Sequence, residues 1–479
     1  MSEKENRNDQ PVVTNGLDGA TGRYLLPPVT RENLGRLVAK VDPDGELRHL
    51  LKDWKEGKAV GDPLRAPSAD VEDPTDLGET GWGVIFAEGT SPRVRRALRP
   101  LLAYREEQAK DLFVDLSHQD GDSQQKFMSR IGVKQGPRAV PEKLPYYLLL
   151  VGDPEKISFR FQSELDIQYA VGRLHFDSES PDDSGACEAY SAYANAVIAS
   201  EEGYRKRRQQ LSFFSVENPG DEATRRLAGG LTNELARVLR DSRPSWKTDV
   251  IASPDSTRER LRRLLLGGPE ERPSILFTAS HGVGFSNGDQ RQCRAQGALV
   301  CQDWAGPGQA LDGKHYFTAN DVPEDADLSG LIAFHFACYS AGTPQFDDFG
   351  QIDVDPKEIA SRPFIARLPQ ELLAKGALAA IGHVDRAWTS SFSWNGEGGH
   401  VQVYNDILKQ LMDGQPVGWA MESMGSYFAA QAAILYDLTD KRQHFSPKDF
   451  AMYSDLWCET NDARNFVVLG DPAVRLNFD

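Results

Sequence analysis

The chain has 479 residues, with 71 acidic and 54 basic side chains and a formal net charge of −17 at pH 7. This length allows about two to four domains and is ample for a buried core. An acidic chain is poorly suited to nucleic acid, whose phosphates dominate binding, so we expect no nucleic-acid partner. No apolar run approaches the roughly 18 residues of a membrane-spanning helix, so we expect no membrane role.

The N-terminal residues and the cysteines indicate the cellular compartment in which the protein resides. The first ten residues, MSEKENRNDQ, are polar and lack the apolar core of a secretion signal. Five scattered cysteines form no disulfide framework and fit a reducing environment. We therefore expect a cytoplasmic protein.

Residues 1–80 read as an N-terminal lead-in, partly disordered or regulatory. They are rich in Gly, Pro and Asp and show little apolar periodicity. One short helix is predicted within 31–56, broken at Pro43.

From residue 81 onward, apolar runs alternate with helical patterns. A first series, 81–203, is interpreted as an N-terminal α/β subdomain, and a second, 204–479, as the main domain. Strands separated by helices favour βαβ units and a mainly parallel sheet covered on both faces, so the fold class is α/β. The predicted strands are 81–89, 111–117, 144–154, 211–220, 246–253, 274–282, 331–342, 376–385 and one within 464–476.

Two of these strands end in residues suited to nucleophilic catalysis. His281 and Gly282 end one strand, and Cys338 lies near the end of the next. Ligands of parallel sheets bind beyond the carboxyl ends of the strands, and a histidine beside a cysteine is the pair that thiolate catalysis requires. The N–H groups of Gly282 and Cys338 are candidate donors to a developing oxyanion. His383, which ends a third strand, is the alternative base.

A metal site is the rival interpretation. His335 and Cys338 lie three apart on a strand, where side chains alternate faces, so they should diverge. Cys293 and Cys301 lack zinc-knuckle spacing, so no cofactor is expected. Oxygen ligands for Ca²⁺ are available in an acidic cluster, although a solvated loop is the favoured interpretation. The cluster consists of Asp347, Asp348, Asp353 and Asp355.

The His281-Gly282 and Ala337-Cys338 strand ends resemble the signature of the caspase/gingipain clan of cysteine peptidases. The caspase motif Q-A-C-[RQG]-G is absent. The gingipain branch matches better, because three further blocks look like that family, and the similarity spans 140–479. The blocks are 146–154, 169–176 and 467–476.

This resemblance implies a caspase-like α/β domain preceded by a smaller related subdomain. It implies a cysteine endopeptidase with Cys338 as nucleophile, His281 as proton donor to the leaving amine, and Gly282 supplying an oxyanion N–H. Because the chain shows neither a secretion signal nor an extra C-terminal domain, we expect an intracellular peptidase. It would be made as a latent precursor and activated by proteolysis in a bacterial regulatory or antiviral defence cascade. Its expected partners are protein substrates and an activating protease or regulator.

Arginine-specific gingipains hold the basic side chain with an acidic residue after the Leu-Val-Gly-Asp block and with a tryptophan beyond the third strand. The matching positions nominate Asp166, with Glu164 in reserve, and Trp388 as the pocket wall. Asp385 is a further candidate for the acid. A guanidinium stacked on an indole is physically sound. We therefore expect cleavage after Arg or Lys.

Two segments are candidates for control of the enzyme. The basic run 204–210 is a possible self-processing site, although such runs are usually solvated surface. The long segment 283–328 is a possible lid or second cleavage site.

A second function class remains open, namely a catalytically silent scaffold that keeps the fold as a binding module. Thiol reactivity separates the two, because only the peptidase requires a reactive Cys338.

Overall fold

The computed structural model describes residues 11–26, 28–39, 72–133, 139–178, 183–267, 272–347, 358–389, 392, 401–439 and 444–478. Its centre is a ten-stranded sheet with the strand order β5-β4-β6-β7-β18-β17-β14-β10-β8-β9. The strands are β4 (Trp82–Ala87), β5 (Phe113–His118), β6 (Tyr147–Val151), β7 (Ala170–Leu174), β8 (Gln210–Ser215), β9 (Lys247–Ile251), β10 (Ile275–Ala279), β14 (Ile332–Phe336), β17 (Ala379–His383) and β18 (Phe466–Gly470).

The sheet consists of two parallel halves joined by one antiparallel pair. Neighbouring strands run parallel throughout, except that β17 and β18 are antiparallel. The central strands are mostly apolar and are buried along their full length, as expected where helices cover both faces. The predicted α/β class with a mainly parallel sheet is therefore confirmed.

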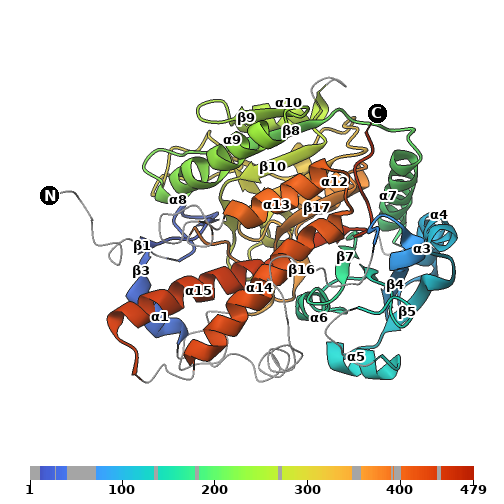
Figure 1. The fold of residues 1–479 in the computed structure, drawn as a ribbon. Coiled ribbons are helices and arrows are strands. Elements are labelled where there is room, and N and C mark those ends of the chain that lie inside the picture. Colours follow the sequence, from blue (N-terminus) through green and yellow to red (C-terminus); the bar gives the residue numbers. More distant parts are fainter. Residues whose placement is uncertain are drawn as a thin grey trace.

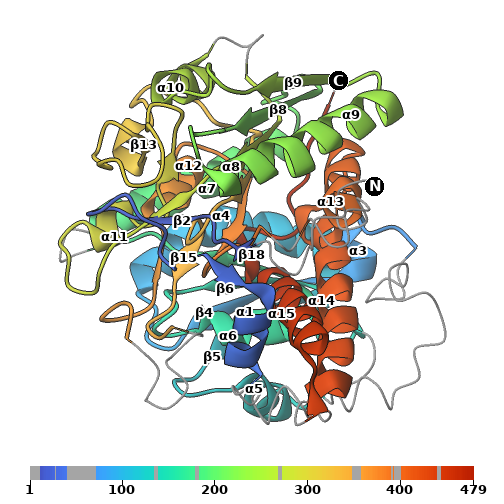
Figure 2. The ribbon, with the colours of Figure 1, turned by 90° about the vertical axis from the view of Figure 1, so that its left-hand side faces the viewer.

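Helices pack in two sets on either side of this sheet (Figure 2). In one set α7 contacts both α4 and α12, and in the other α9, α13, α14 and α15 follow one another in contact. Their bounds are α4 (Pro92–Ala109), α7 (Ser184–Glu201), α9 (Asn233–Ser242), α12 (Arg367–Ala374), α13 (Val401–Met412), α14 (Val417–Thr439) and α15 (Pro447–Asn465). Among the residues described, no helix is long and apolar enough to cross a membrane.

Shorter helices complete the chain: α3 (Leu77–Thr80), α5 (Gln124–Arg130), α6 (Phe159–Leu165), α8 (Glu222–Arg226), α10 (Arg258–Leu266) and α11 (Gln292–Ala295). One π-helical stretch at Leu227–Thr232 separates α8 from α9. The proposed boundary at residue 203 stays a prediction, and strands from both sides of it pair within one sheet, since β7 neighbours β18.

The N-terminal segment, residues 11–26 and 28–38, folds onto the rest of the chain. It contains β1 (Pro11–Val12), β2 (Gly16–Asp18), β3 (Val29–Thr30) and α1 (Arg31–Val38). Figure 1 shows α1 lying beside α15, where Arg31 Nε is 2.8 Å from Asp455 Oδ1. The predicted helix over 31–56 is therefore seen in its first part, and residues 40–71, with Pro43, lie outside the described residues.

Part of the long segment 283–328 forms a small second sheet with the N-terminal segment. Its strands are β11 (Gly282–Gly284), β12 (Leu299–Val300) and β13 (Tyr316–Phe317). The order is β13-β12-β11-β2, and β2 pairs parallel with β11. The small sheet packs around buried Leu17, Phe285 and Trp304.

A buried ionic network connects β4 and α4 with the turn after β18, the last strand of the fold. Arg105 in α4 contacts Asp471 at 2.7 Å and Glu201 at 2.6 Å, and the arginine is 1% exposed. Trp82 Nε1 donates to the other oxygen of Asp471 at 2.9 Å. Both oxygens of Asp471 are thus used, in the turn directly after β18.

Asp471→Ala should lower the free energy of unfolding by about 3–5 kcal/mol, because it leaves the Arg105 guanidinium buried beside one carboxylate instead of two. Asp413→Ala is the matched control, since Asp413 pairs with Arg243 at the surface and should cost at most about 1 kcal/mol. Urea unfolding measures both. Equal losses in the two variants would contradict a structural role for the buried network.

Candidate functional site

His281 and Cys338 lie at the same edge of the ten-stranded sheet. β10 and β14 are parallel neighbours, and their last paired residues are Ala279 and Phe336. His281 and Cys338 therefore each lie two residues after the last pair between β10 and β14. Both side chains are completely buried.

Gly282 brings the two candidate oxyanion donors together. A Cβ atom at residue 282 would lie 1.8 Å from the carbonyl oxygen of Cys338, so only glycine permits this approach of the two backbones. The carbonyl oxygen of Asn15 accepts hydrogen bonds from the N–H of Gly282 at 2.8 Å and from the N–H of Cys338 at 3.3 Å. A peptide carbonyl from the N-terminal segment thus occupies the position expected of an attacked carbonyl.

The Cys338 thiol lies against the same peptide. The N–H of Ala387 donates to Sγ at 3.1 Å, and a Cβ atom at Gly16 would lie 2.9 Å from Sγ. Burial raises the pKa of the thiol, and the hydrogen bond from Ala387 and the charge of Arg386 oppose this shift only in part. In this arrangement the thiol is protonated at neutral pH and needs a base before it can attack.

The residue after the cysteine has an unusual backbone. Tyr339 has φ = +57°, which is uncommon outside glycine, asparagine and aspartate. Its N–H donates to the carbonyl of Asp385 at 2.8 Å. This left-handed turn directs the chain away from the sheet immediately after Cys338.

A carboxylate orients His281. Nε2 of the imidazole lies 2.5 Å from Oδ2 of Asp221, the N-cap residue of α8. The Tyr24 hydroxyl donates to Oδ1 of the same carboxylate at 2.5 Å. Burial alone would raise the pKa of Asp221, but the charge and hydrogen bond of His281, with the hydroxyls of Tyr24 and Thr224, outweigh burial and lower it.

The opposite ring nitrogen of His281 is not engaged by Asp221. Nδ1 is buried and has no hydrogen-bond partner among the residues described. The main-chain carbonyl of His281 accepts from Val300 at 2.9 Å, which fixes the backbone against β12. A protonated thiol is activated as a nucleophile by a base that a third group orients. Cys338, His281 and the ionised Asp221 are side chains of these three types.

Of the predicted specificity residues, Trp388 lies beside the N-terminal segment. Trp388 forms an antiparallel bridge with Thr14, and its indole packs in a cluster that includes Val12. The Asp385 carboxylate is buried and accepts from the N–H of Arg386 at 2.7 Å.

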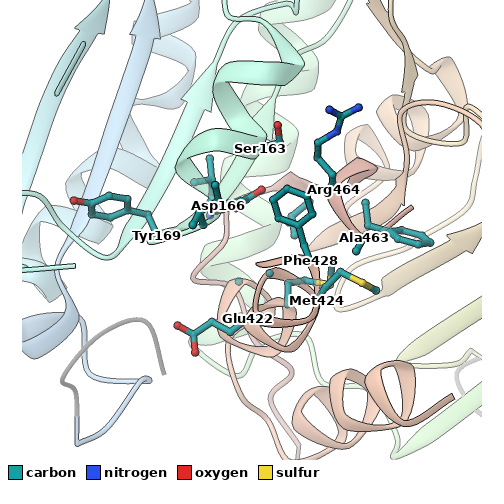
Figure 3. Close-up of a pocket in the computed structure, with 15 residues that line it drawn as sticks. Ser163, Asp166, Tyr169, Glu422, Met424, Phe428, Ala463 and Arg464 are labelled. Atoms are coloured by element: carbon teal, nitrogen blue, oxygen red, sulfur yellow. Dashed lines mark hydrogen bonds between the residues drawn. The ribbon is translucent and has the colours of Figure 1, made fainter. Parts of the chain in front are cut away.

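Asp166 belongs to a different region, the pocket shown in Figure 3, and Glu164 lies in α6 just before it. Asp166 follows α6, accepts from the N–H of Val171 at 3.0 Å, and has its pKa raised by burial. It lines a pocket with Phe428 and Arg464 whose lining includes neither Cys338 nor His281. Glu164 pairs with Arg160 at 2.7 Å. Their proposed contact with a substrate stays a prediction.

The remaining candidate histidines have structural contacts. His383 Nδ1 lies 2.9 Å from the carbonyl of Asp385, and its Nε2 lies 3.4 Å from Asp462. His335 Nδ1 lies 2.8 Å from the Thr278 hydroxyl, and burial lowers the pKa of His335 to about 4. His335 is therefore neutral at physiological pH.

Metal ligands do not gather in the described part of the chain, where no group of three or more His, Cys, Asp or Glu side chains could hold an ion. Asp347 of the acidic cluster is paired instead with Arg386, at 2.7 and 2.5 Å. The other three members, Asp348, Asp353 and Asp355, lie outside the described residues.

Three residues at the site were not predicted: Asn15, Tyr24 and Asp221. Asp221 follows β8, the neighbour of β10, so the residues after that strand carried a usable signal. Asn15 and Tyr24 lie in a segment interpreted as a lead-in. Their position depends on contacts across the whole chain, which no local pattern reveals.

Comparison with known proteins gives only distant likenesses. The complex of the pro- and mature domains of RgpB from Porphyromonas gingivalis aligns with a TM-score of 0.44 and 14% identity, covering 83% of this chain and 80% of that chain. The separase–securin complex from Saccharomyces cerevisiae aligns with a TM-score of 0.31 and 10% identity, covering 69% of this chain and 16% of that chain. No family model and no curated protein matches the sequence.

Gly282→Ala should destabilise the chain by about 3 kcal/mol or more, because the added methyl group collides with backbone rather than with a movable side chain. Gly185→Ala is the matched control, since a Cβ there meets no atom within 4 Å and the residue lies in α7. Alanine at 185 should be neutral or stabilising by up to about 1 kcal/mol. Chemical denaturation of the two variants checks this. Tolerance of alanine at 282 would refute the described approach of the backbones.

Proposed function

We propose that this chain is a cysteine peptidase in which Cys338 attacks a peptide carbonyl and His281 transfers the proton. One observation carries the proposal. A peptide carbonyl oxygen is bound by the N–H groups of Gly282 and Cys338, and the Cys338 thiol lies against the same peptide. Two converging backbone donors are the usual device for stabilising the oxyanion of acyl transfer.

The residues present account for each step. Sγ of Cys338 bonds to the carbonyl carbon while the thiol proton passes to His281, and the oxygen takes up negative charge between the two N–H groups. Collapse breaks the C–N bond, and His281 gives its proton to the departing amine. Water then hydrolyses the thioester, releasing a carboxylic acid and restoring the thiol. Asp221 orients the imidazole and stabilises its cationic form.

The course of the bound segment supports internal cleavage of chains. Residues 11–14 extend on one side of the Asn15 carbonyl and residues 16–26 on the other, and both sides contact the fold. A site that accommodates chain in both directions suits an endopeptidase acting on protein substrates.

The sequence resemblance implies further properties, which remain proposals. A latent precursor is supported by the complete burial of Cys338 under the N-terminal segment. Cleavage after Arg or Lys, a cytoplasmic location and a role in a bacterial defence cascade rest on the resemblance. Of the four residues nominated to hold a basic side chain, Trp388 pairs with the bound segment.

Hydrolysis of a quenched-fluorescence peptide library tests the proposal. In the full chain, Gly16→Leu should displace the N-terminal segment, because a side chain at 16 would collide with Leu25 and with the thiol. The site is then uncovered, and the variant should hydrolyse peptides. Adding Cys338→Ala should reduce hydrolysis to background. Cys301→Ala, which alters another completely buried thiol, should change it little.

Asp221→Asn should lower kcat by about 10²- to 10⁴-fold, because an amide orients the imidazole without stabilising its cation. Circular dichroism should show an unchanged fold. Equal hydrolysis with and without Cys338 would refute the proposal, and absence of hydrolysis from every variant would favour the silent scaffold.

A further inference from the structure

The N-terminal segment occupies the site as an added strand. The N–H of Asn15 donates to the carbonyl of Ala387 at 2.9 Å, and the N–H and hydroxyl of Thr389 donate to the carbonyl of Val13 at 3.3 and 3.1 Å. Thr14 pairs antiparallel with Trp388 between them. Strand addition of this kind is a common way to bind an extended peptide, because backbone hydrogen bonds hold any sequence.

The segment is also held beyond the thiol, by different elements. Gly16–Asp18 pairs parallel with Gly282–Gly284, and the N–H of Leu25 donates to the carbonyl of Gly16 at 3.0 Å. The peptide bond between Asn15 and Gly16 therefore lies between two independent attachments. Its carbonyl is the group bound by the Gly282 and Cys338 N–H groups.

The two residues at this bond are unusual for a merely structural contact. The Asn15 side chain is 0% exposed, yet its Oδ1 and Nδ2 have no hydrogen-bond partner among the described residues. Burying an unpaired amide is unfavourable, so the stability of the resting fold gives no reason for asparagine here. Gly16 lies so close to the thiol that a side chain would displace the segment.

We infer, on the basis of the proposed peptidase function, that the N-terminal segment is the enzyme's own substrate. Cys338 cleaves the Asn15–Gly16 bond, and asparagine is the residue that the site accepts before the scissile bond. The enclosed position of Asn15 fits a short amide side chain. It differs from the basic residue that the sequence resemblance implies.

The reaction balances with water as the only co-reactant. The Cys338 sulfur bonds to the carbonyl carbon of Asn15, the thiol proton passes to His281, and the C–N bond to Gly16 breaks as His281 protonates the new amino group. Hydrolysis of the thioester leaves Asn15 with a carboxylate and regenerates the thiol.

Cleavage would separate two functions of the segment. Residues up to Asn15 pair with residues 387–389 and become free to leave. Residues from Gly16 onward stay attached through β2, and Tyr24 keeps its hydrogen bond to Asp221. The product is thus an enzyme in which residues 387–389 can pair with a substrate strand while Asp221, the orienting acid, remains in place.

Intact mass and N-terminal sequencing of the purified full chain test the cleavage. Wild type should convert to a chain that begins at Gly16, and Cys338→Ala should stay uncut. An asparagine can also break the peptide bond after it without an enzyme, when its side-chain amide nitrogen attacks its own main-chain carbonyl, so the exposed Asn287–Gly288 bond is the internal control. It should survive while Asn15–Gly16 is cut. Cleavage at Asn15–Gly16 in Cys338→Ala as well, or a wild-type cut within 204–210 instead, would overturn the inference.

Residue preference is tested in the same chain and with peptides. Asn15→Ala and Asn15→Arg should each slow self-cleavage about 10-fold or more. Peptides Val-Val-Thr-X-Gly-Leu should be hydrolysed by the Gly16→Leu chain about 10-fold faster with X = Asn than with X = Arg, Lys or Asp. The peptide series remains decisive if the variants at residue 15 fail to fold.

The outcomes distinguish this inference from the proposed function. Cysteine-dependent hydrolysis after Arg or Lys, with Asn15–Gly16 intact, overturns the inference and leaves the peptidase standing. Hydrolysis of the Asn peptide by the Gly16→Leu chain, while the wild-type chain stays uncut, makes the segment an inhibitor and also overturns it. No cysteine-dependent hydrolysis of any peptide, and no self-cleavage, refutes both.

Discussion

The approach of the Gly282 backbone to the Cys338 backbone is the constraint on which the site depends. Parallel pairing of β10 with β14 brings the two strand ends level, but register alone would leave room for a side chain between them. Glycine removes that side chain, so two N–H groups converge on one oxygen. Because neither donor is a side chain, the donor pair is as rigid as the sheet itself, and such preorganisation makes an oxyanion site effective.

The N-terminal segment is fixed far from the thiol as well as near it. α1 packs along α15 and carries the Arg31–Asp455 ion pair, and Val12 shares a buried cluster with Trp388. Ordering an extended strand costs conformational entropy at each residue. The contacts of α1 and Val12 offset this entropic cost, so the few hydrogen bonds near the thiol are enough to keep the segment bound.

The sequence predicted the sheet and the two strand ends because both follow from local patterns. Apolar runs bounded by glycine marked β10 and β14, and parallel pairing then placed His281 and Cys338 at one edge. Asp221 lay within reach of the same reasoning, because it follows the neighbouring strand. Asn15 did not, because a short Gly-rich segment carries no periodicity, and its place is determined by pairing with residues more than 250 positions away. Asp166 shows a different limit. Similarity to a family's sequence block identified this residue, but such similarity carries no information on its distance from Cys338 in the fold.

Covering the thiol has a chemical consequence beyond steric exclusion. Burial raises the pKa of Cys338, and the thiolate is the form that oxidants and alkylating agents attack. The covered thiol is therefore protected from reactions in solution, while the peptide that covers it keeps its carbonyl beside the sulfur and between the two N–H donors. Removing the thiol proton then requires a base within the site. His281 is the candidate base, and it is oriented by Asp221, which accepts a hydrogen bond from Tyr24. Because Tyr24 belongs to the covering segment, one stretch of chain both excludes outside reagents and holds the base ready.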